Sequence, residues 1–176
     1  MFTLVIGGAA SGKSGYAESL VLCSEHRPRY YIATMQPFDA ECRARIAKHR
    51  NLRAEKEFET IECYVNLSSL RLPERGTVLL ECLGNLAANE LYDPAGAGSE
   101  DAALQAIVDG VDSLLCQCGD LIVVGNEVCA DGGGYAPETE RYRRLLAHVN
   151  RALAEQADCV CEVVSGIPCC YKGAAG

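Results

Sequence analysis

Five short apolar runs divide the chain, and each is almost continuously hydrophobic. Strands that are buried on both faces have this pattern, because helices cover both sides of a parallel sheet. An alternation of polar and apolar residues would instead indicate a sheet with one wet face. The runs predict five strands of a mainly parallel sheet, at Thr3–Ile6, Tyr30–Ala33, Val78–Cys82, Leu121–Val124 and Val160–Val164.

Segments with helical spacing lie between these runs. Their apolar residues recur every three or four positions, as on a helix with one buried face. Strands that alternate with helices form right-handed crossovers and a doubly wound sheet. We therefore predict one α/β domain over 1–176, with a mainly parallel sheet flanked by helices. The predicted helices span Lys13–Cys23, Asp39–His49, Glu100–Leu115 and Pro137–Gln156.

Two loops interrupt this alternation. Tyr92–Ser99 is rich in turn residues and ends at Ser99, a predicted helix cap. Cys129–Pro137 contains three consecutive glycines and follows a predicted strand end. Because ligands of open parallel sheets bind at the carboxyl ends of the strands, we expect the second loop to be the functional one.

The strongest chemical motif is Gly7-Gly8-Ala9-Ala10-Ser11-Gly12-Lys13-Ser14, which matches G-x-x-x-x-G-K-[ST]. It follows an apolar strand and precedes a helical segment, which is the context of a P-loop. In such a loop, backbone N–H groups and the helix start bind phosphate oxygens, Lys13 reaches the β- and γ-phosphates, and Ser14 binds Mg²⁺. The sequence thus predicts a P-loop NTPase. The alternative is a glycine-rich turn with an incidental lysine.

Acidic and polar residues follow two of the predicted strands. Glu81 ends an apolar run, where an unpaired carboxylate would be costly to bury, so it is predicted to hold Mg²⁺ at the end of a neighbouring strand. A helix cap or an ion pair is the alternative role of Glu81. Asn126 and Glu127 follow the next strand and reach the same edge, where structural capping is also an alternative.

One of the three histidines lies in a basic segment. His49 stands within Arg43–Arg53, which carries several cations in an otherwise acidic chain. A basic helix end is often only a solvated face. A histidine among arginines can instead be a nucleophile toward phosphorus, because its neutral ring attacks while the cations stabilise the oxyanions. His26 and His148 suit a solvated turn and a helix surface.

Composition and charge limit the function classes. The net charge of −8 and pI near 4.9 argue against non-specific binding to nucleic acid or to an anionic membrane. No apolar stretch approaches the roughly 20 residues needed to span a bilayer, so we expect a cytoplasmic protein. Eleven cysteines without an export signal indicate reduced thiols rather than a disulfide scaffold, and their spacing is not CxxC. We expect most to be small buried or surface residues, with metal or redox use as the alternative.

A series of motifs along nearly the whole chain resembles the bifunctional adenosylcobinamide kinase/adenosylcobinamide-phosphate guanylyltransferases of cobalamin biosynthesis. The P-loop alone is generic, but this series in this order is specific. The motifs after the P-loop are Tyr31-Ile32-Ala33-Thr34, Ala44-Arg45-Ile46-x-x-His49-Arg50, Thr60-x-Glu62, Leu79-Leu80-Glu81-Cys82-Leu83, Asn89, Asn126-Glu127-Val128, Asn150 and Val163-Val164-Ser165-Gly166-Ile167-Pro168.

The resemblance implies a RecA-like fold, a homotrimer and two activities. One phosphorylates adenosylcobinamide with ATP or GTP. The other transfers GMP from GTP to the resulting phosphate through a guanylylated histidine, which falls on His49. Lys13 belongs to the catalytic set, Ser14 and Glu81 to the metal site. The implied guanine-nucleotide contacts are Ala33, Thr34, Met35, Arg50, Asn51, Leu52, Arg53, Glu62 and Glu81.

Four departures from the family pattern affect this interpretation. They are Ala10, where the family usually has Arg; Phe58, near which the family usually has Trp; the altered stretch Cys129–Pro137; and Arg144, where Asp is common. Two alternatives therefore stay open. The chain could be a P-loop small-molecule kinase that lacks nucleotidyl transfer, or a nucleotide-sensing P-loop module without chemistry of its own.

Overall fold

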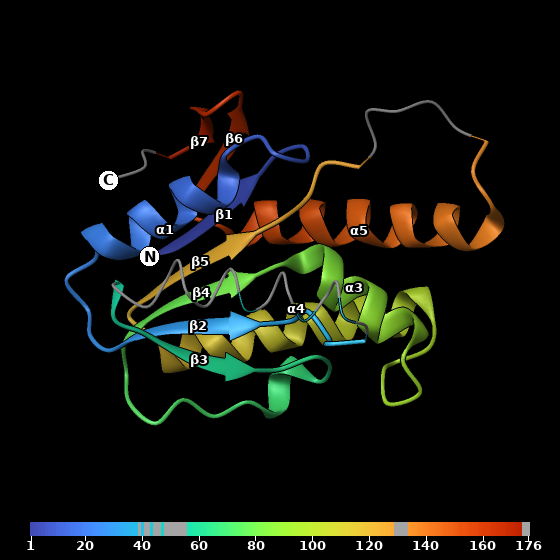
Figure 1. Cartoon of the computed structure of the whole chain (residues 1–176), viewed down its shortest axis with the longest axis horizontal. Coiled ribbons are helices and arrows are strands. Elements are labelled where there is room, and N and C mark those ends of the chain that lie inside the picture. Colours follow the sequence, from blue (N-terminus) through green and yellow to red (C-terminus); the bar gives the residue numbers. More distant parts are fainter. Residues whose placement is uncertain (39, 41–42, 44–46, 48–55, 129–133, 174–176) are drawn as a thin grey trace.

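A computed structural model describes residues 1–38, 40, 43, 47, 56–128 and 134–173. Its centre is a seven-stranded sheet in the order β3-β2-β4-β5-β1-β6-β7 (Figure 1). All neighbouring strands are parallel except β6 and β7, which form an antiparallel hairpin at one edge. The strands are β1 (Phe2–Ile6), β2 (Arg29–Ala33), β3 (Phe58–Glu62), β4 (Thr77–Glu81), β5 (Asp120–Val124), β6 (Cys159–Val164) and β7 (Ile167–Lys172).

Helices cover both faces of the sheet, as the continuous apolar runs predicted. On one side α1 packs over alternate strand residues that include Val5, Tyr31 and Leu79. On the other side, three helices and a short 3-10 helix cover Leu4, Ile32 and their counterparts. The helices are α1 (Lys13–Cys23), α3 (Leu83–Tyr92), α4 (Glu100–Gln117) and α5 (Pro137–Gln156), with η2 at Leu67–Ser69.

The predicted elements match the structure closely. The bounds of α1 and α5 are as predicted, and each predicted strand is shifted or extended by a single residue at one or both ends. Ser99 caps α4, since its hydroxyl accepts a hydrogen bond from the backbone N–H of Ala102 at 3.3 Å. Within the predicted helix 39–49, Ala40, Arg43 and Ala47 are described and are helical; the remaining residues of this helix lie outside the described part.

Four elements were not predicted: β3, β7, η2 and α3. The strands β3 and β7 form the two edges of the sheet, and their outward faces are polar or exposed, so neither gives a continuous apolar run. The helix α3 is a run of small and apolar residues directly after β4. Cys82 caps its amino end, since the Cys82 sulfur accepts a hydrogen bond from the Asn85 N–H at 3.4 Å.

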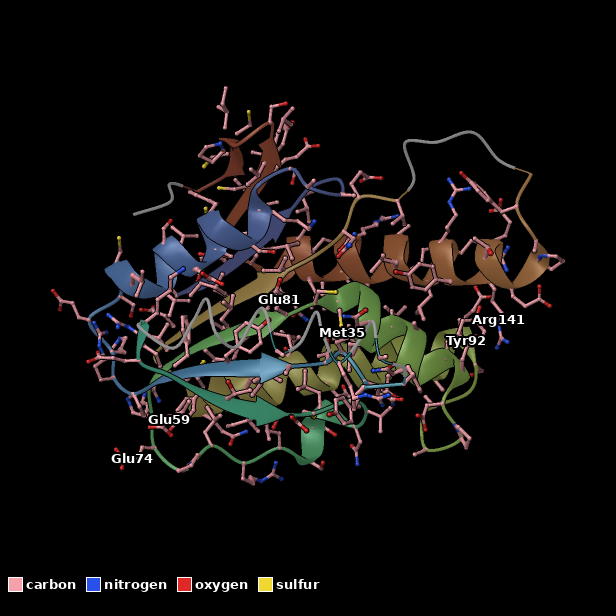
Figure 2. The ribbon with its side chains drawn as sticks, in the orientation of Figure 1. Met35, Glu59, Glu74, Glu81, Tyr92 and Arg141 are labelled. Carbon is pink, nitrogen blue, oxygen red and sulfur yellow. The ribbon has the colours of Figure 1, made fainter. Side chains whose placement is uncertain are left out.

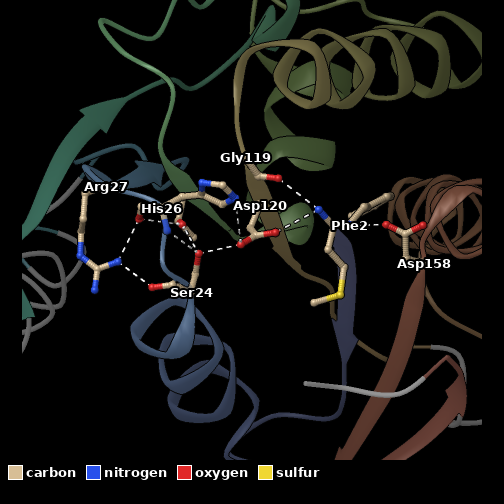
Figure 3. Close-up of polar contacts among 9 residues, drawn as sticks. Phe2, Ser24, His26, Arg27, Gly119, Asp120 and Asp158 are labelled. Carbon is tan, nitrogen blue, oxygen red and sulfur yellow. Dashed lines mark hydrogen bonds and ion pairs between the residues drawn. The ribbon is translucent and has the colours of Figure 1, made fainter.

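The amino ends of the strands carry their own polar network, far from the P-loop edge. Asp120, at the start of β5, accepts hydrogen bonds from the Ser24 hydroxyl at 2.6 Å and from the Met1 amine at 2.9 Å (Figure 3). His26 Nε2 lies 4.0 Å from the same carboxylate. This network joins the end of α1 to β1 and β5. Among the described residues, no helix is both long and apolar enough to cross a membrane.

Candidate functional site

The P-loop joins β1 to α1 at the carboxyl edge of the sheet. Gly12 precedes the helix with φ of 93°, in the left-handed region that residues with a Cβ rarely adopt. Lys13 is buried at the first position of α1, and its Nζ donates a hydrogen bond to the Gly8 carbonyl oxygen at 3.0 Å. The ammonium group therefore lies across the loop, where the N–H groups and the helix start can bind an anion.

The turn between β6 and β7 supports the loop from one side. The Gly166 N–H donates to the Ser11 carbonyl at 2.8 Å. A Cβ on Gly7 would lie 2.7 Å from the Val163 carbonyl oxygen, and one on Gly12 would lie 3.2 Å from the Gly166 Cα. These close approaches explain why glycine is needed at both positions.

Glu81 lies beside the P-loop serine. The Ser14 hydroxyl donates to Glu81 Oε1 at 2.8 Å, and the Tyr31 hydroxyl donates to Glu81 Oε2. Figure 2 shows Glu81 at the carboxyl end of β4. We expected its strand to be adjacent to β1, but β5 lies between β4 and β1. The two side chains still meet, because α1 packs across β4 and β5 as well as β1.

The oxygen set of Ser14 and Glu81 suits a hard divalent cation. Mg²⁺ prefers oxygen ligands, usually one or two from protein side chains together with substrate phosphates. A serine hydroxyl and a half-buried carboxylate in contact, next to a phosphate-binding loop, meet that requirement. The residues present therefore fit magnesium at the position predicted from the sequence.

Thr34 joins the carboxyl ends of β2 and β4. Its hydroxyl lies 3.0 Å from the carbonyl oxygens of Glu81 and Cys82 and accepts from the Cys82 N–H at 2.8 Å. The Asn89 amide donates to the Thr34 carbonyl at 2.8 Å and to the Tyr64 carbonyl at 3.0 Å. The Thr34 N–H also donates to the Glu81 carbonyl at 3.2 Å, so both the side chain and the backbone of Thr34 take part in holding these strand ends together.

Of the other implied nucleotide contacts, the structure describes three, Ala33, Met35 and Glu62. Ala33 and Met35 are half-buried at the end of β2 and just beyond it, and Figure 2 labels Met35 past that strand. Glu62 is exposed at the end of β3 and accepts from the Tyr64 hydroxyl at 2.7 Å. These residues share the carboxyl edge with Glu81. His49 and Arg50–Arg53 lie outside the described residues.

A second polar group follows β5 at the same edge. The Glu127 N–H donates to the Gly7 carbonyl at 3.1 Å, so this chain segment holds the P-loop from the other side. The Asn150 amide donates to the Asn126 carbonyl at 3.1 Å, and the side-chain oxygens of both asparagines are buried without a hydrogen-bond partner in the described part of the chain. Burial raises the pKa of the nearby Tyr142 to about 12, so its hydroxyl stays a donor.

Three of the four departures have a structural setting. Ala10 is exposed on the loop with φ of 55°. Phe58 packs edge-to-face on Tyr31, with ring centroids 6.1 Å apart. Arg144 Nη2 lies 2.9 Å from Glu100 Oε1 and so links α5 to the start of α4, away from the P-loop. Of the fourth stretch, positions 129–133 lie outside the described residues.

The sequence did not reveal the role of Tyr31. Tyr31 belongs to a predicted strand and to a family motif, but neither assigned a role to its hydroxyl, although a buried tyrosine hydroxyl needs a polar partner. Its ring is 5% exposed on the α1 face, and its hydroxyl supplies a hydrogen bond to Glu81. Because a buried tyrosine hydroxyl needs a hydrogen-bond partner, the sequence could have indicated a role for Tyr31. Glu81 could not be identified as that partner without the register of β2 against β4.

The model of one protein family, described as cobinamide kinase / cobinamide phosphate guanyltransferase, matches residues 3–171. The chain belongs to this family. It is 37% identical to the "Bifunctional adenosylcobalamin biosynthesis protein CobU" of Escherichia coli K12, over 95% of this chain and 97% of that protein. It is 33% identical to the protein named CobP of Pseudomonas aeruginosa PAO1, over 98% of each. The resemblance inferred from the motifs is therefore confirmed.

A solved structure supports the fold independently of sequence. The flagellar accessory protein FlaH from Methanocaldococcus jannaschii superposes with a TM-score of 0.53 at 12% identity, over 98% of this chain and 78% of that chain. At this identity the likeness concerns the fold alone. Together with the parallel sheet and the loop after β1, it confirms the predicted RecA-like P-loop class.

Proposed function

We propose that this family member catalyses both reactions of the family's description. It phosphorylates adenosylcobinamide with ATP or GTP and then transfers GMP from GTP to adenosylcobinamide phosphate. The observation that carries the proposal is the family match over residues 3–171, which includes the P-loop, Glu81 and the segment around His49. Ser14 and Glu81 in contact at 2.8 Å add the geometry that phosphoryl transfer needs.

The kinase reaction is assigned to the P-loop side chains. The loop N–H groups and Lys13 bind and orient the β- and γ-phosphates, while Lys13 stabilises the charge that develops on the transferred oxygens. Ser14 and Glu81 would hold Mg²⁺, which when bound neutralises phosphate charge and aligns the triphosphate. Tyr31 positions Glu81 through its hydrogen bond.

Guanylyl transfer is assigned to His49 as nucleophile, on the sequence and the family resemblance. An imidazole nitrogen attacks the α-phosphorus of GTP, so that an N–P bond forms and the bond to pyrophosphate breaks. The phosphate of the corrinoid then attacks the same phosphorus and releases the imidazole. Arg50 and Arg53 would stabilise the oxyanions, with Ala33, Thr34, Met35, Asn51, Leu52 and Glu62 beside the nucleotide.

A labelling experiment tests this assignment. The protein is incubated with Mg²⁺ and GTP labelled at the α-phosphorus, and the protein is then tested for a covalent label that is acid-labile and base-stable, as a phosphoramidate is. A label is the expected result. If none forms while adenosylcobinamide is phosphorylated, the chain is a kinase that lacks nucleotidyl transfer. If corrinoid and triphosphate yield neither a nucleoside diphosphate with phosphorylated corrinoid nor pyrophosphate, the chain is a binding module.

Two substitutions should separate the reactions. Lys13→Ala should slow phosphorylation by roughly 10²-fold or more, because it removes a fixed charge from a transition-state oxyanion. His49→Ala should abolish GMP labelling and formation of adenosylcobinamide-GDP while leaving much of the phosphorylation. Covalent GMP on the His49→Ala protein would show that the nucleophile is another residue.

The proposed assembly is a homotrimer with subunit contacts near the nucleotide sites, and the proposed location is the cytoplasm. The trimer is supported by the family resemblance alone. Multi-angle light scattering at micromolar concentration should give three times the 18.9 kDa chain mass. A monomer under these conditions would contradict the proposal.

A further inference from the structure

Three cysteine thiols meet on the hairpin that supports the P-loop. Cys159 and Cys161 stand two residues apart on β6, and Cys170 is the cross-strand partner of Cys161 on β7. The Sγ atoms of Cys159 and Cys161 are 3.6 Å apart, and those of Cys161 and Cys170 are 2.6 Å apart. All three sulfur atoms lie within 4.8 Å of one another. Within the described residues, no other group of three or more cysteine, histidine or acidic side chains is this compact.

The strand geometry places these thiols on one face of the sheet. Side chains two residues apart on a strand share a face, and Val163 continues the series from Cys159 and Cys161. Val163 packs in the cluster beneath α1, so the thiols also lie on the α1 side. The Tyr16 hydroxyl, one turn into that helix, lies 3.9 Å from the Cys161 sulfur. Tyr16 thus connects the thiol cluster to the first turn of α1, which also carries Ser14.

We propose that Cys159, Cys161 and Cys170 form a site for a thiophilic divalent cation of the Zn²⁺ class. Thiolates are the preferred ligands of such ions, and Zn–S bonds of about 2.3 Å place the sulfur atoms roughly 3.8 Å apart. The Cys159–Cys161 separation of 3.6 Å already fits this value. The Cys161–Cys170 pair must open by about 1 Å to reach it, which the exposed edge strand β7 permits.

Binding releases protons as the thiols become ligands. Cysteine binds such ions as the thiolate and not as the thiol. On binding, three S–H bonds break, three S–metal bonds form, and three protons pass to solvent. Metal affinity should therefore rise with pH. Water can complete the coordination from the exposed side of Cys170.

A bound ion would join β6 to β7 on the hairpin whose turn touches the P-loop. Gly166, in that turn, donates to the Ser11 carbonyl at 2.8 Å. Metal binding should therefore stabilise the hairpin and raise Tm, since a ligand that binds only the folded state shifts the unfolding equilibrium. The site is distinct from the oxygen ligands Ser14 and Glu81 and does not depend on the proposed enzymatic function.

The test uses the reduced full-length protein titrated with Cd²⁺, a spectroscopic substitute for Zn²⁺. One equivalent should produce an ultraviolet thiolate-to-metal charge-transfer band, release protons and raise Tm, and Zn²⁺ should displace the Cd²⁺. Binding to the oxygen ligands of the P-loop would give no such band. Cys170→Ser should abolish the band, and Cys161→Ser should do the same.

Cys169→Ser is the matched control. Cys169 is also exposed on β7, but as the neighbour of Cys170 it faces the opposite side of the strand, so its replacement should leave the band unchanged. Since Cys170 is exposed, its replacement should not prevent folding, which circular dichroism checks. A band that survives Cys170→Ser would overturn the proposal. So would a disulfide between Cys161 and Cys170 that persists in the protein isolated under reducing conditions, shown by peptide mapping.

Discussion

The Tyr31 hydroxyl offers a way to test how Glu81 is held. Tyr31→Phe removes only the oxygen that donates to Glu81 Oε2 and keeps the ring. The edge-to-face packing on Phe58, at 6.1 Å between ring centroids, should survive, as should the burial of the ring on the α1 face. The substitution therefore changes the orientation of Glu81 without opening a cavity.

The expected magnitude follows from the hydrogen bond and its exposure. A hydrogen bond to a charged group contributes roughly 1.5–3 kcal/mol, and the cost of removing the donor is smaller where water can take its place. Glu81 is half-buried, and Ser14 still holds its other oxygen at 2.8 Å. We therefore expect a loss of about 1–2 kcal/mol of transition-state stabilisation, which corresponds to roughly a 5- to 30-fold lower kcat/KM for phosphorylation.

The assay is adenosylcobinamide phosphorylation measured over a range of Mg²⁺ concentrations. If Tyr31 positions the metal ligand, Tyr31→Phe should raise the Mg²⁺ concentration needed for half-maximal rate as well as lower kcat. Tyr171→Phe is the matched control, because the Tyr171 hydroxyl donates to Glu162 at 2.8 Å on the exposed hairpin. Rates for Tyr31→Phe within twofold of wild type at every Mg²⁺ concentration would refute the reasoning.

Two further predictions concern stability and are measured by thermal or urea denaturation. Gly12→Ala should lower the free energy of unfolding by about 1–3 kcal/mol, because φ of 93° strains alanine and its Cβ would lie 3.2 Å from the Gly166 Cα. The control is Gly15→Ala in α1, which should stabilise the protein by about 0.5–1 kcal/mol because nothing lies within 4 Å of the new Cβ. Equal effects of the two substitutions would contradict the strain argument. Asp120→Asn should destabilise by roughly 1–3 kcal/mol at neutral pH and flatten the loss of stability in acid. Burial raises the pKa of Asp120, but the hydrogen bonds from Ser24 and the amino terminus outweigh burial, so the pKa is lowered overall (Figure 3). The stabilisation by Asp120 is therefore present above about pH 4 and is lost as pH falls through the folded-state pKa. If Asp120→Asn leaves the acid dependence of stability unchanged, Asp120 does not contribute in this way.

Much of the site was readable from local sequence. The P-loop could be predicted because its chemistry resides in consecutive residues, from Gly7 to Ser14, and the flanking strand and helix are set by local patterns. The helix bounds of α1 and α5 followed from the same periodicity. Family membership rested on the order of motifs, which the match over residues 3–171 confirms. The role of His49 stays a prediction, since the residue lies outside the described part of the chain.

Tertiary structure decided which distant residues meet. Glu81 was predicted at the metal site, but the intervening strand β5 and the path of α1 across it follow from sheet order, which no local pattern encodes. The hydrogen bond from Tyr31 to Glu81 depends on the register of β2 against β4, where Ala33 pairs with Glu81.

The cysteines show the same limit most clearly. The sequence placed Cys161 in a predicted strand, Val160–Val164, and the structure extends that strand to Cys159, so the two side chains share a face. Their spacing of two residues differs from the CxxC spacing of common zinc sites, so the spacing alone did not indicate a metal site here. The third thiol, Cys170, arrives from an exposed edge strand that has no apolar run to reveal it, through an antiparallel pairing with Cys161. Sequence fixes what each strand presents locally, whereas the cluster depends on long-range pairing, and only the folded chain brings the three sulfur atoms together.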